Sequence, residues 1–208
     1  MRVIGLTGSI ACGKSTVAAH LRSRNVSVLD ADVIAREIVS PGSPALEELR
    51  AVFGETIIAR DGTLDRSALG ALVFGNDAHR HKLNAITHNR IWERASERIA
   101  ELAAKGEVLV VWEAALLIEN GSADMFRPLI VVTCAPAVQL ERLMKRDGSA
   151  KADAQARLSA QMSAAEKAAH ADYVIANDGD AFDVKVRTDE VLGKICDQCG
   201  FPRSRFGL

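Results

Sequence analysis

The sequence predicts an α/β fold in which a five-stranded parallel sheet is flanked by helices. Short, continuously apolar runs alternate with segments of helical spacing, a pattern typical of parallel strands that are buried on both faces. A glycine-rich loop follows the first apolar run and precedes the first helical segment. That order of strand, loop and helix is typical of phosphate-binding α/β proteins.

Five segments are predicted as strands because they are short, mostly apolar and separated by helical patterns. They are residues 2–6, 26–30, 107–112, 128–134 and 172–177. In an open parallel sheet, ligands bind outside the carboxyl ends of the strands. We therefore expect functional residues directly after these segments.

Two further stretches do not fit simple helical connections between neighbouring strands. Residues 41–104 are long, helical and punctuated by prolines, glycines and a turn, which predicts a helical insertion that binds the acceptor substrate. Residues 147–169 are rich in alanine and charge but poor in large apolar residues, which predicts a helical lid that closes over a ligand. The chain 1–208 is then a single unit, with a nucleotide-binding core formed by 1–40, 105–146 and 170–208.

The near-zero net charge gives no reason to expect a nucleic acid or an anionic membrane as a partner. The chain has 26 Lys and Arg against 27 Asp and Glu, so no basic field favours nucleic acid or an anionic membrane. No apolar run reaches the roughly 18 residues needed to cross a bilayer, and we expect a cytoplasmic protein. The four cysteines do not form a disulfide framework in a chain of this size. The oligomeric state stays open.

The loop from Gly8 to Ser15 fits the spacing GxxxxGK[S/T] at every fixed position. Between a strand and a helix N-terminus, such a loop presents backbone N–H groups to an anion of several charges. The expected anion is a nucleoside triphosphate, ATP. Lys14 would reach its β- and γ-phosphates, and the Ser15 hydroxyl would bind Mg²⁺.

Other positions separate the protein classes that share this loop. GTPases read guanine with an NKxD segment, but no asparagine of this chain precedes a lysine. Helicases and transport ATPases usually end a hydrophobic strand in adjacent acids, whereas here the strand 107–112 is followed by the single acid Glu113. The small size and the two helical insertions favour a kinase for a small molecule.

Such a kinase needs a carboxylate near the γ-phosphate to accept the proton of the attacking hydroxyl. Asp30 and Asp32 follow the second predicted strand, and their spacing directs both to one side of an extended chain. One would accept the proton while the other orders the waters of Mg²⁺. The structural alternatives are a strand-end turn for Asp30 and a helix N-cap for Asp32. Both interpretations stay open for Asp30, and catalysis is favoured for Asp32.

Two arginines, Arg142 and Arg146, precede the predicted lid and are one helical turn apart. Because they share a helix face, both could bind phosphate oxygens when the lid closes. Arg157 lies farther along and, taken alone, is predicted to be a solvated surface residue.

Several segments, taken in order, resemble the dephospho-coenzyme A kinase family. They are "IGLTGSIACGKSTVA", "VLDADVIAREIVSPGSPAL", "LNAITH", "LERLMKRDG" with "ARLSAQ", and "ADYVIANDGD". The resemblance extends to about Asp180, and its specificity lies in order and spacing together. It implies a P-loop kinase-like fold. It also implies transfer of the ATP γ-phosphate to the ribose 3′-hydroxyl of dephospho-CoA, which gives coenzyme A and ADP.

The resemblance implies roles for individual residues. Asp32 resembles the catalytic base, and Lys14 and Arg142 are implied in the transfer step. Asn177 is implied as an adenine-side contact, and Asp30 is a candidate Mg²⁺ ligand through water. The implied nucleotide-binding set is Gly8, Ala11, Cys12, Gly13, Lys14, Ser15, Thr16, Arg142, Arg146 and Asn177.

Three positions depart from the family pattern. Asn89 and Ala115 stand where proline is common, which concerns the local backbone and not the chemistry. Cys12 stands where serine or another small residue is common. The alternative functions are a nucleoside or nucleotide monophosphate kinase, which shares loop, lid and sheet, and an ATP-binding switch module.

Cys12 permits two hypotheses. It lies inside the predicted anion cradle and just before a helix, and both features favour a reactive thiolate. Alternatively, it is a small, inert loop residue whose side chain points into the protein. The sequence leaves these two hypotheses open.

Overall fold

The computed structural model describes the backbone of all 208 residues and every side chain except that of Ala181. The chain forms two compact units. We call them the core unit, Met1–Leu29 with Lys105–Leu208, and the helical unit, Asp30–Ala104.

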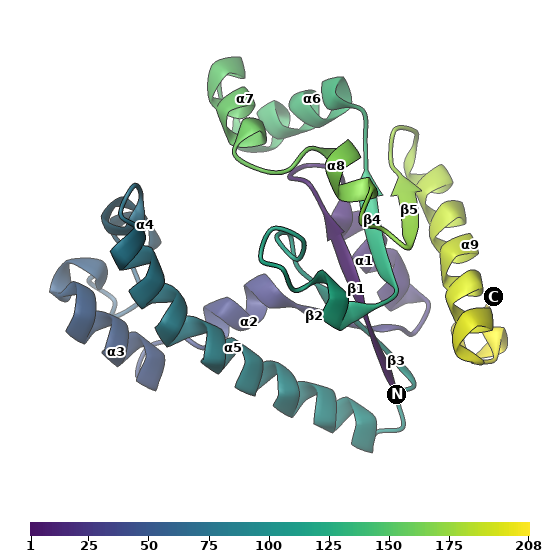
Figure 1. The fold of residues 1–208 in the computed structure, drawn as a ribbon, viewed down its shortest axis with the longest axis horizontal. Coiled ribbons are helices and arrows are strands. Elements are labelled where there is room, and N and C mark those ends of the chain that lie inside the picture. Colours follow the sequence, from purple (N-terminus) through teal and green to yellow (C-terminus); the bar gives the residue numbers. More distant parts are fainter. The chain divides into compact units, whose positions relative to one another are not determined.

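The sheet has the strand order β2-β3-β1-β4-β5 (Figure 1). Its strands are β1 (Arg2–Gly8), β2 (Ser27–Asp30), β3 (Leu109–Glu113), β4 (Leu129–Thr133) and β5 (Tyr173–Ala176). β1 runs parallel to β3 and β4, and β4 runs parallel to β5. The predicted five-stranded parallel sheet is confirmed. Its central strand, β1, leads directly into the glycine-rich loop.

Helices cover the sheet because its strands are apolar on both faces. Those of the core unit are α1 (Lys14–Ser23), α6 (Pro136–Asp147), α7 (Lys151–Ser159), α8 (Ala164–Ala168) and α9 (Ala181–Cys199), with the short turns η2 (Ala123–Phe126) and η3 (Arg203–Phe206). α1 packs against α9, and α8 packs against β4. Ile4 of β1, Val17 of α1 and Ile195 of α9 belong to one buried cluster. This cluster fixes the start of α1 relative to the central strand.

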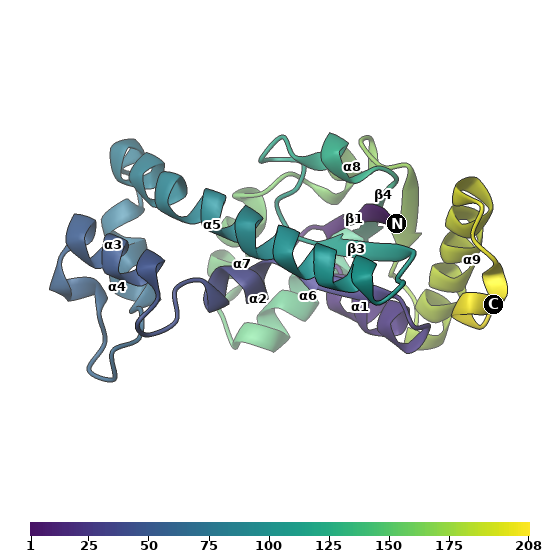
Figure 2. The same ribbon diagram turned by 90° about the horizontal axis from the view of Figure 1, so that it is seen from below.

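The helical unit is organised along one long helix, α5 (Figure 2). Its elements are α2 (Ala31–Glu37), α3 (Pro44–Phe53), η1 (Glu55–Ile57), α4 (Arg66–Val73) and α5 (Asp77–Ala104). α5 contacts α2, α3 and α4. It continues through Asn89, so asparagine at that position leaves the helix unbroken.

The helical unit begins at Asp30, before position 41, because α2 packs on α5. An ion-pair cluster joins them: Arg94 Nη2 lies 2.7 Å from Glu37 Oε1, and Arg98 Nη2 lies 2.9 Å from Glu37 Oε2. The hydrogen bond from Arg94 lowers the pKa of Glu37, burial opposes this, and Arg98 lowers it further. α2 therefore belongs structurally with the helices that follow it.

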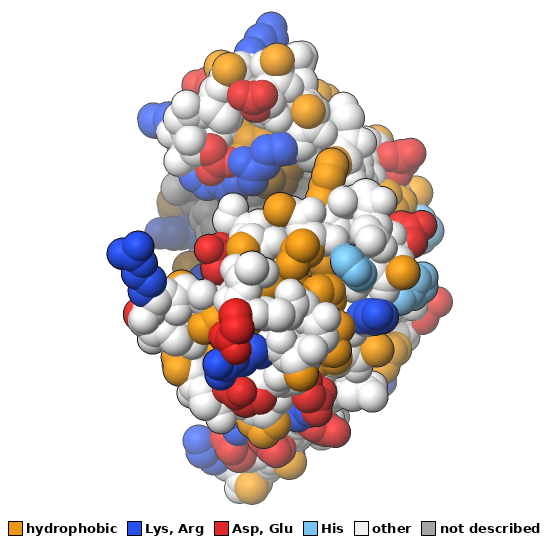
Figure 3. Space-filling model, turned by 90° about the vertical axis from the view of Figure 1, so that its left-hand side faces the viewer, with side chains coloured by type: hydrophobic (Ala, Val, Ile, Leu, Met, Phe, Trp, Pro, Cys, Tyr) orange, Lys and Arg blue, Asp and Glu red, His pale blue; other side chains and the backbone are white. Residues whose placement is uncertain are grey.

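Surface side chains of different kinds are mixed on the face shown in Figure 3, where hydrophobic groups, histidines and charges lie among one another. In the helical unit, Val33, Val52 and Phe74 are exposed hydrophobic residues. In the described part of the chain, none of the helices combines the length and apolar composition of a membrane-spanning segment.

Candidate active site

The glycine-rich loop connects β1 to α1 with two residues in the left-handed region, Ala11 at φ 61° and Gly13 at φ 86°. Steric fit explains both fixed glycines. A Cβ at Gly13 would lie 1.9 Å from Asn177 Nδ2, and a Cβ at Gly8 would lie 2.6 Å from the Val132 carbonyl oxygen. Left-handed backbone at a non-glycine residue is uncommon and is concentrated at functional sites. The loop is therefore held in a specific conformation by the strand and turn beside it.

Lys14, the first residue of α1, forms an ion pair with Glu113 at the end of β3. Lys14 Nζ lies 2.7 Å from Glu113 Oε1, and the Glu113 side chain is only 4% exposed. Arg22 Nη2 lies 3.5 Å from the other oxygen, Oε2. β1 and β3 pair so that Leu6 is opposite Glu113, which places this carboxylate at the ligand edge of the sheet. Glu113 therefore holds the Lys14 ammonium group at the N-terminus of α1.

Glu113 is a functional candidate that the sequence analysis used only to exclude other protein classes. Its signal was its position, a single acid directly after an apolar strand. The strand order places β3 beside β1, and that adjacency could not be derived from the residues alone.

Asn177, the implied adenine-side contact, lies under the phosphate loop. Its side-chain Nδ2 donates to the Cys12 carbonyl oxygen at 2.8 Å, and its backbone N–H donates to the Thr133 carbonyl oxygen at 2.8 Å. Its own carbonyl oxygen accepts a hydrogen bond from Arg142 Nη1 at 2.8 Å. The side chain therefore supports the loop, and its contact with adenine stays a prediction.

The three arginines around the predicted lid have different partners. Arg142 of α6 donates to the Asn177 carbonyl oxygen, whereas Arg146 Nε lies 2.8 Å from Asp147 Oδ1. Arg157 of α7 pairs with the same carboxylate. Hydrogen bonds from Arg146 and then Arg157 lower the pKa of Asp147, with burial opposing them. Asp147 thus joins α6 to α7 through two ion pairs, and its single negative charge leaves the three groups with a net charge of about +1.

Asp30 and Asp32 belong to the helical unit, and the structure assigns them different local roles. Asp30 is the N-cap of α2, where its Oδ1 accepts from the N–H groups of Asp32 at 2.8 Å and Val33 at 3.3 Å. Asp32 is exposed in the first turn of α2. The N-cap alternative considered for Asp32 is therefore wrong, because Asp30 occupies that position.

The hypothesis that Cys12 is a reactive thiolate in the anion cradle is also wrong. Its side chain is fully buried, and its Sγ lies 3.2 Å from Cys134 Sγ, the residue after β4. The hydrogen bond with Cys134 and burial raise the pKa of the Cys12 thiol far above its usual range. Cys12 thus contributes its backbone to the loop, while its side chain points into the protein.

The start of the phosphate loop is bonded to the segments on both sides of α7. The N–H of Ile10 donates to Gln161 Oε1 at 3.0 Å, and the Ile10 carbonyl oxygen accepts from Gln139 Nε2 at 2.7 Å. Ser9 Oγ donates to the Met162 carbonyl oxygen at 3.0 Å. Neither glutamine was among the site residues predicted from the sequence, although Gln161 ends the segment "ARLSAQ" that resembles the family.

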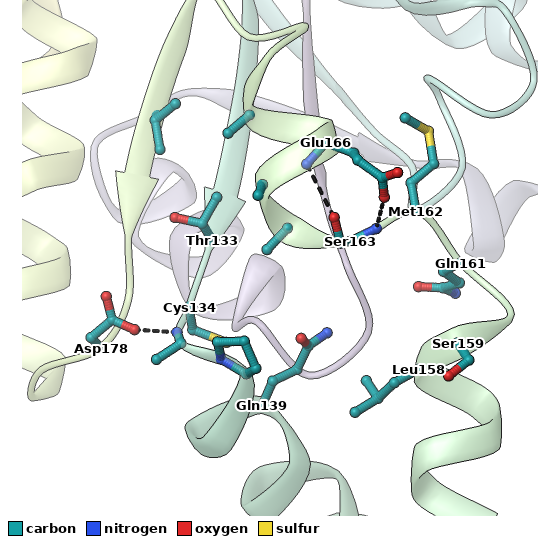
Figure 4. A pocket seen from close by; sticks show the side chains of 16 residues that line it. Thr133, Cys134, Gln139, Leu158, Ser159, Gln161, Met162, Ser163, Glu166 and Asp178 are labelled. Atoms are coloured by element: carbon teal, nitrogen blue, oxygen red, sulfur yellow. Dashed lines mark hydrogen bonds between the residues drawn. The ribbon is translucent and has the colours of Figure 1, made fainter.

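Gln139, Gln161 and Met162 border a cavity of about 620 Å³ between α6, the end of α7, and α8. Figure 4 shows Cys134, Gln139, Gln161 and Met162 around it. All of its lining residues belong to the core unit. The cavity lies next to the phosphate loop through the bonds of Gln139 and Gln161 to Ile10.

Lys167 of α8 is a buried cation that the sequence analysis also missed. It is fully buried, and its Nζ donates to the Ala115 carbonyl oxygen at 2.7 Å and lies 3.0 Å from Glu119 Oε1. Thr7 Oγ1 donates to the same Ala115 oxygen at 3.1 Å. The backbone at Ala115, one of the three positions that depart from the resemblance, is thus held by two side chains.

Mg²⁺ fits the groups found at the ligand edge. Ser15 is exposed at the N-terminus of α1, beside Lys14 and its partner Glu113. Hydroxyl and carboxylate oxygens are the ligands that Mg²⁺ prefers, with phosphates and waters supplying the rest. Among the described residues, no group of three or more His, Cys, Asp or Glu could hold a metal without such added ligands.

Comparison with known proteins gives consistent matches across both units. The profile of the family described as dephospho-CoA kinase matches residues 2–183. A dephospho-CoA kinase of Anaeromyxobacter dehalogenans (strain 2CP-C) is 47% identical over 195 residues, covering 94% of this chain and 92% of that protein. One of Geobacter sulfurreducens is 44% identical over 194 residues, with coverages of 93% and 98%.

A solved structure has the same fold. The dephospho-CoA kinase from Campylobacter jejuni superposes with a TM-score of 0.70 at 29% sequence identity. The match covers 95% of this chain and 99% of that one. The phosphate loop, the helical unit and the segment around α7 all lie within the range that the family profile matches.

Proposed function

The chain belongs to the dephospho-CoA kinase family, and from this membership we propose how its residues transfer the γ-phosphate of ATP to dephospho-CoA. The reaction is the ATP-dependent phosphorylation of dephospho-CoA, a step of coenzyme A synthesis. A nucleoside or nucleotide monophosphate kinase and an ATP-binding switch are not favoured. The main support for the mechanism is the phosphate loop, at whose end Lys14 is held by an ion pair with Glu113.

We propose that the loop binds the phosphates through backbone N–H groups from Ala11 to Thr16. The left-handed residues Ala11 and Gly13 support this, because such turns form concave rows of N–H groups. Lys14 exchanges Glu113 for the β- and γ-phosphates. Ser15 and Glu113 are the groups that would hold Mg²⁺, directly or through water. When bound, the ion neutralises charge that develops on the phosphate oxygens.

Asp32 is the proposed general base for the ribose 3′-hydroxyl of the acceptor. Its carboxylate is exposed, whereas one oxygen of Asp30 is engaged in capping α2. Asp30 thus positions the first turn of α2, which carries Asp32. We also propose that Asp30 contacts Mg²⁺ through a water molecule. The helical unit is the proposed binding region for the acceptor.

The arginines of the predicted lid, residues 147–169, and of α6 would stabilise the transferring phosphoryl group. Charge spreads over its oxygens in the transition state, so fixed cations lower the barrier. Arg146 and Arg157 share Asp147 as a partner, which keeps them together until phosphate competes for them. Arg142 lies beside the turn at Asn177, where adenine contact is proposed.

The expected cytoplasmic location stays a prediction.

An acceptor panel tests this function. Protein with MgATP is offered dephospho-CoA, AMP, CMP, adenosine and a dephospho-CoA analogue that lacks the ribose 3′-hydroxyl. We expect the highest kcat/KM for dephospho-CoA, with formation of coenzyme A. The 3′-deoxy analogue should compete with dephospho-CoA but remain unphosphorylated. A higher kcat/KM for a nucleotide or nucleoside, or phosphorylation of the deoxy analogue, would overturn the assignment.

A further inference from the structure

Two thiols meet behind the phosphate loop, although they are far apart in the sequence. Cys12 lies inside the loop, and Cys134 follows β4. Their sulfur atoms are 3.2 Å apart, and both residues are buried, with exposures of 0% and 5%. Neither thiol has a role in the phosphate transfer described above. Their proximity therefore needs its own explanation.

The two thiols differ in acidity. The hydrogen bond with Cys12 lowers the pKa of Cys134, burial opposes this, and the nearby positive charge of Arg142 lowers it further. The pKa of Cys12 is raised by the same hydrogen bond and by burial. Thiolates and not thiols are the reactive nucleophiles. Cys134 is thus the attacking sulfur of the pair, and Cys12 is the neighbour that can resolve its oxidation product.

A small oxidant has a route to Cys134. This residue lines the cavity of about 620 Å³ next to the phosphate loop, together with Gln139 and Gln161. Figure 4 shows the Cys134 side chain among the groups around that cavity. Cys12 does not line the cavity, which agrees with its role as the second thiol.

We propose that Cys12 and Cys134 are a peroxide-sensitive pair whose disulfide reversibly inactivates the phosphate loop. The Cys134 thiolate attacks one oxygen of hydrogen peroxide, which forms a sulfenic acid and releases hydroxide. Conversion of Cys134 to an uncharged sulfenic acid removes the thiolate that raised the pKa of Cys12. The Cys12 sulfur then attacks the sulfenic sulfur as its proton passes to the departing hydroxyl, so the S–S bond forms and water is released. In total, two thiols and one peroxide give one disulfide and two waters, and a dithiol reductant restores the thiols.

The disulfide would act on catalysis through the loop backbone. Bond formation draws the sulfurs closer than 3.2 Å, and Cys12 lies between Ala11 and Gly13, the two left-handed residues. Its carbonyl oxygen is bonded to Asn177, so the loop cannot shift without disturbing that support. An ångström-scale misplacement of reacting groups can cost about 10²-fold in rate. This step rests on the proposed function of the loop, whereas disulfide formation itself does not.

The experiment treats the full-length protein with equimolar hydrogen peroxide, blocks the remaining thiols and maps cysteine peptides by mass spectrometry. Activity with MgATP and dephospho-CoA is measured in parallel. We expect a Cys12–Cys134 crosslink, a fall in kcat/KM of tenfold or more, and recovery of both after dithiothreitol. Cys134→Ser should retain basal activity and resist peroxide. Cys199→Ser, which alters a half-buried cysteine of α9, should remain as sensitive as the parent protein.

Each outcome decides the proposal. Absence of the Cys12–Cys134 peptide after peroxide refutes it in the parent protein, without reliance on any variant. A crosslinked protein with unchanged kcat/KM refutes the inactivation, as does a Cys134→Ser variant inactivated as fast as the parent. If untreated protein does not phosphorylate dephospho-CoA, the proposed function fails, and the peptide map still tests the pair.

Discussion

Replacing Lys167 by methionine should strongly destabilise the core unit. The ammonium group is fully buried, with the Ala115 carbonyl oxygen at 2.7 Å and Glu119 Oε1 at 3.0 Å as partners. Removing one member of a buried ion pair typically costs about 3–5 kcal/mol, because the other charge loses its compensation. The Glu119 side chain is 21% exposed and can regain some hydration, and Thr7 still donates to the Ala115 oxygen. We therefore expect a loss near the lower limit, about 3 kcal/mol.

Thermal unfolding followed by circular dichroism measures this loss. For a chain of this length, about 1 kcal/mol changes Tm by about 2–4 °C, so Lys167→Met should unfold about 6–12 °C below the parent. Adding Glu119→Gln removes the uncompensated charge and should restore part of the difference. Lys194→Met, on the exposed side of α9, is the matched control and should change Tm little. A Tm for Lys167→Met within about 2 °C of the parent would refute the reasoning.

Lys14→Ala should reduce kcat/KM by at least about 10²-fold, and a folded variant of near-normal activity would contradict the phosphate-loop assignment. Asp32→Asn should lower kcat by about 10²–10⁴-fold with little change in ATP affinity. Asp30→Asn should cost less, and the reverse order would show that the wrong carboxylate was chosen. Gly13→Ala should abolish ATP binding in calorimetry, because its Cβ would meet Asn177 at 1.9 Å. Gly42→Ala, at φ 80° with no atom within 4 Å, carries only the backbone strain and should bind ATP normally.

The sheet and the phosphate loop could be predicted from the sequence because both depend on local patterns. Apolar runs define buried strands, and the spacing of Gly8, Gly13 and Lys14 defines the loop. Each pattern lies within a short stretch of chain, so no knowledge of tertiary neighbours is needed. The family resemblance added the acceptor, which local patterns alone did not identify.

The partners inside the site could not be predicted in this way, because they come from distant segments. Lys14 meets Glu113 only because β1 and β3 are adjacent, and Cys12 turns inward because Cys134 lies behind it. The N-cap of α2 could have been Asp30 or Asp32, and the start of the helix at Ala31 assigns it to Asp30. Sequence patterns therefore predicted where the phosphate loop lies in the chain, whereas the side chains that contact it depend on tertiary packing.

The backbone of Ile10 is hydrogen-bonded by side chains from two segments, one before α7 and one after it, and this limits which parts of the chain fix the loop. Gln139 bonds its carbonyl oxygen before α7 begins, and Gln161 bonds its N–H after α7 ends. The chain between these anchors turns at Gly148, which has a φ of 61° and can reverse direction at low cost. The phosphate loop is therefore anchored outside α7, so substitutions at exposed positions of α7 that keep Arg157 should leave the backbone N–H groups of the loop in place.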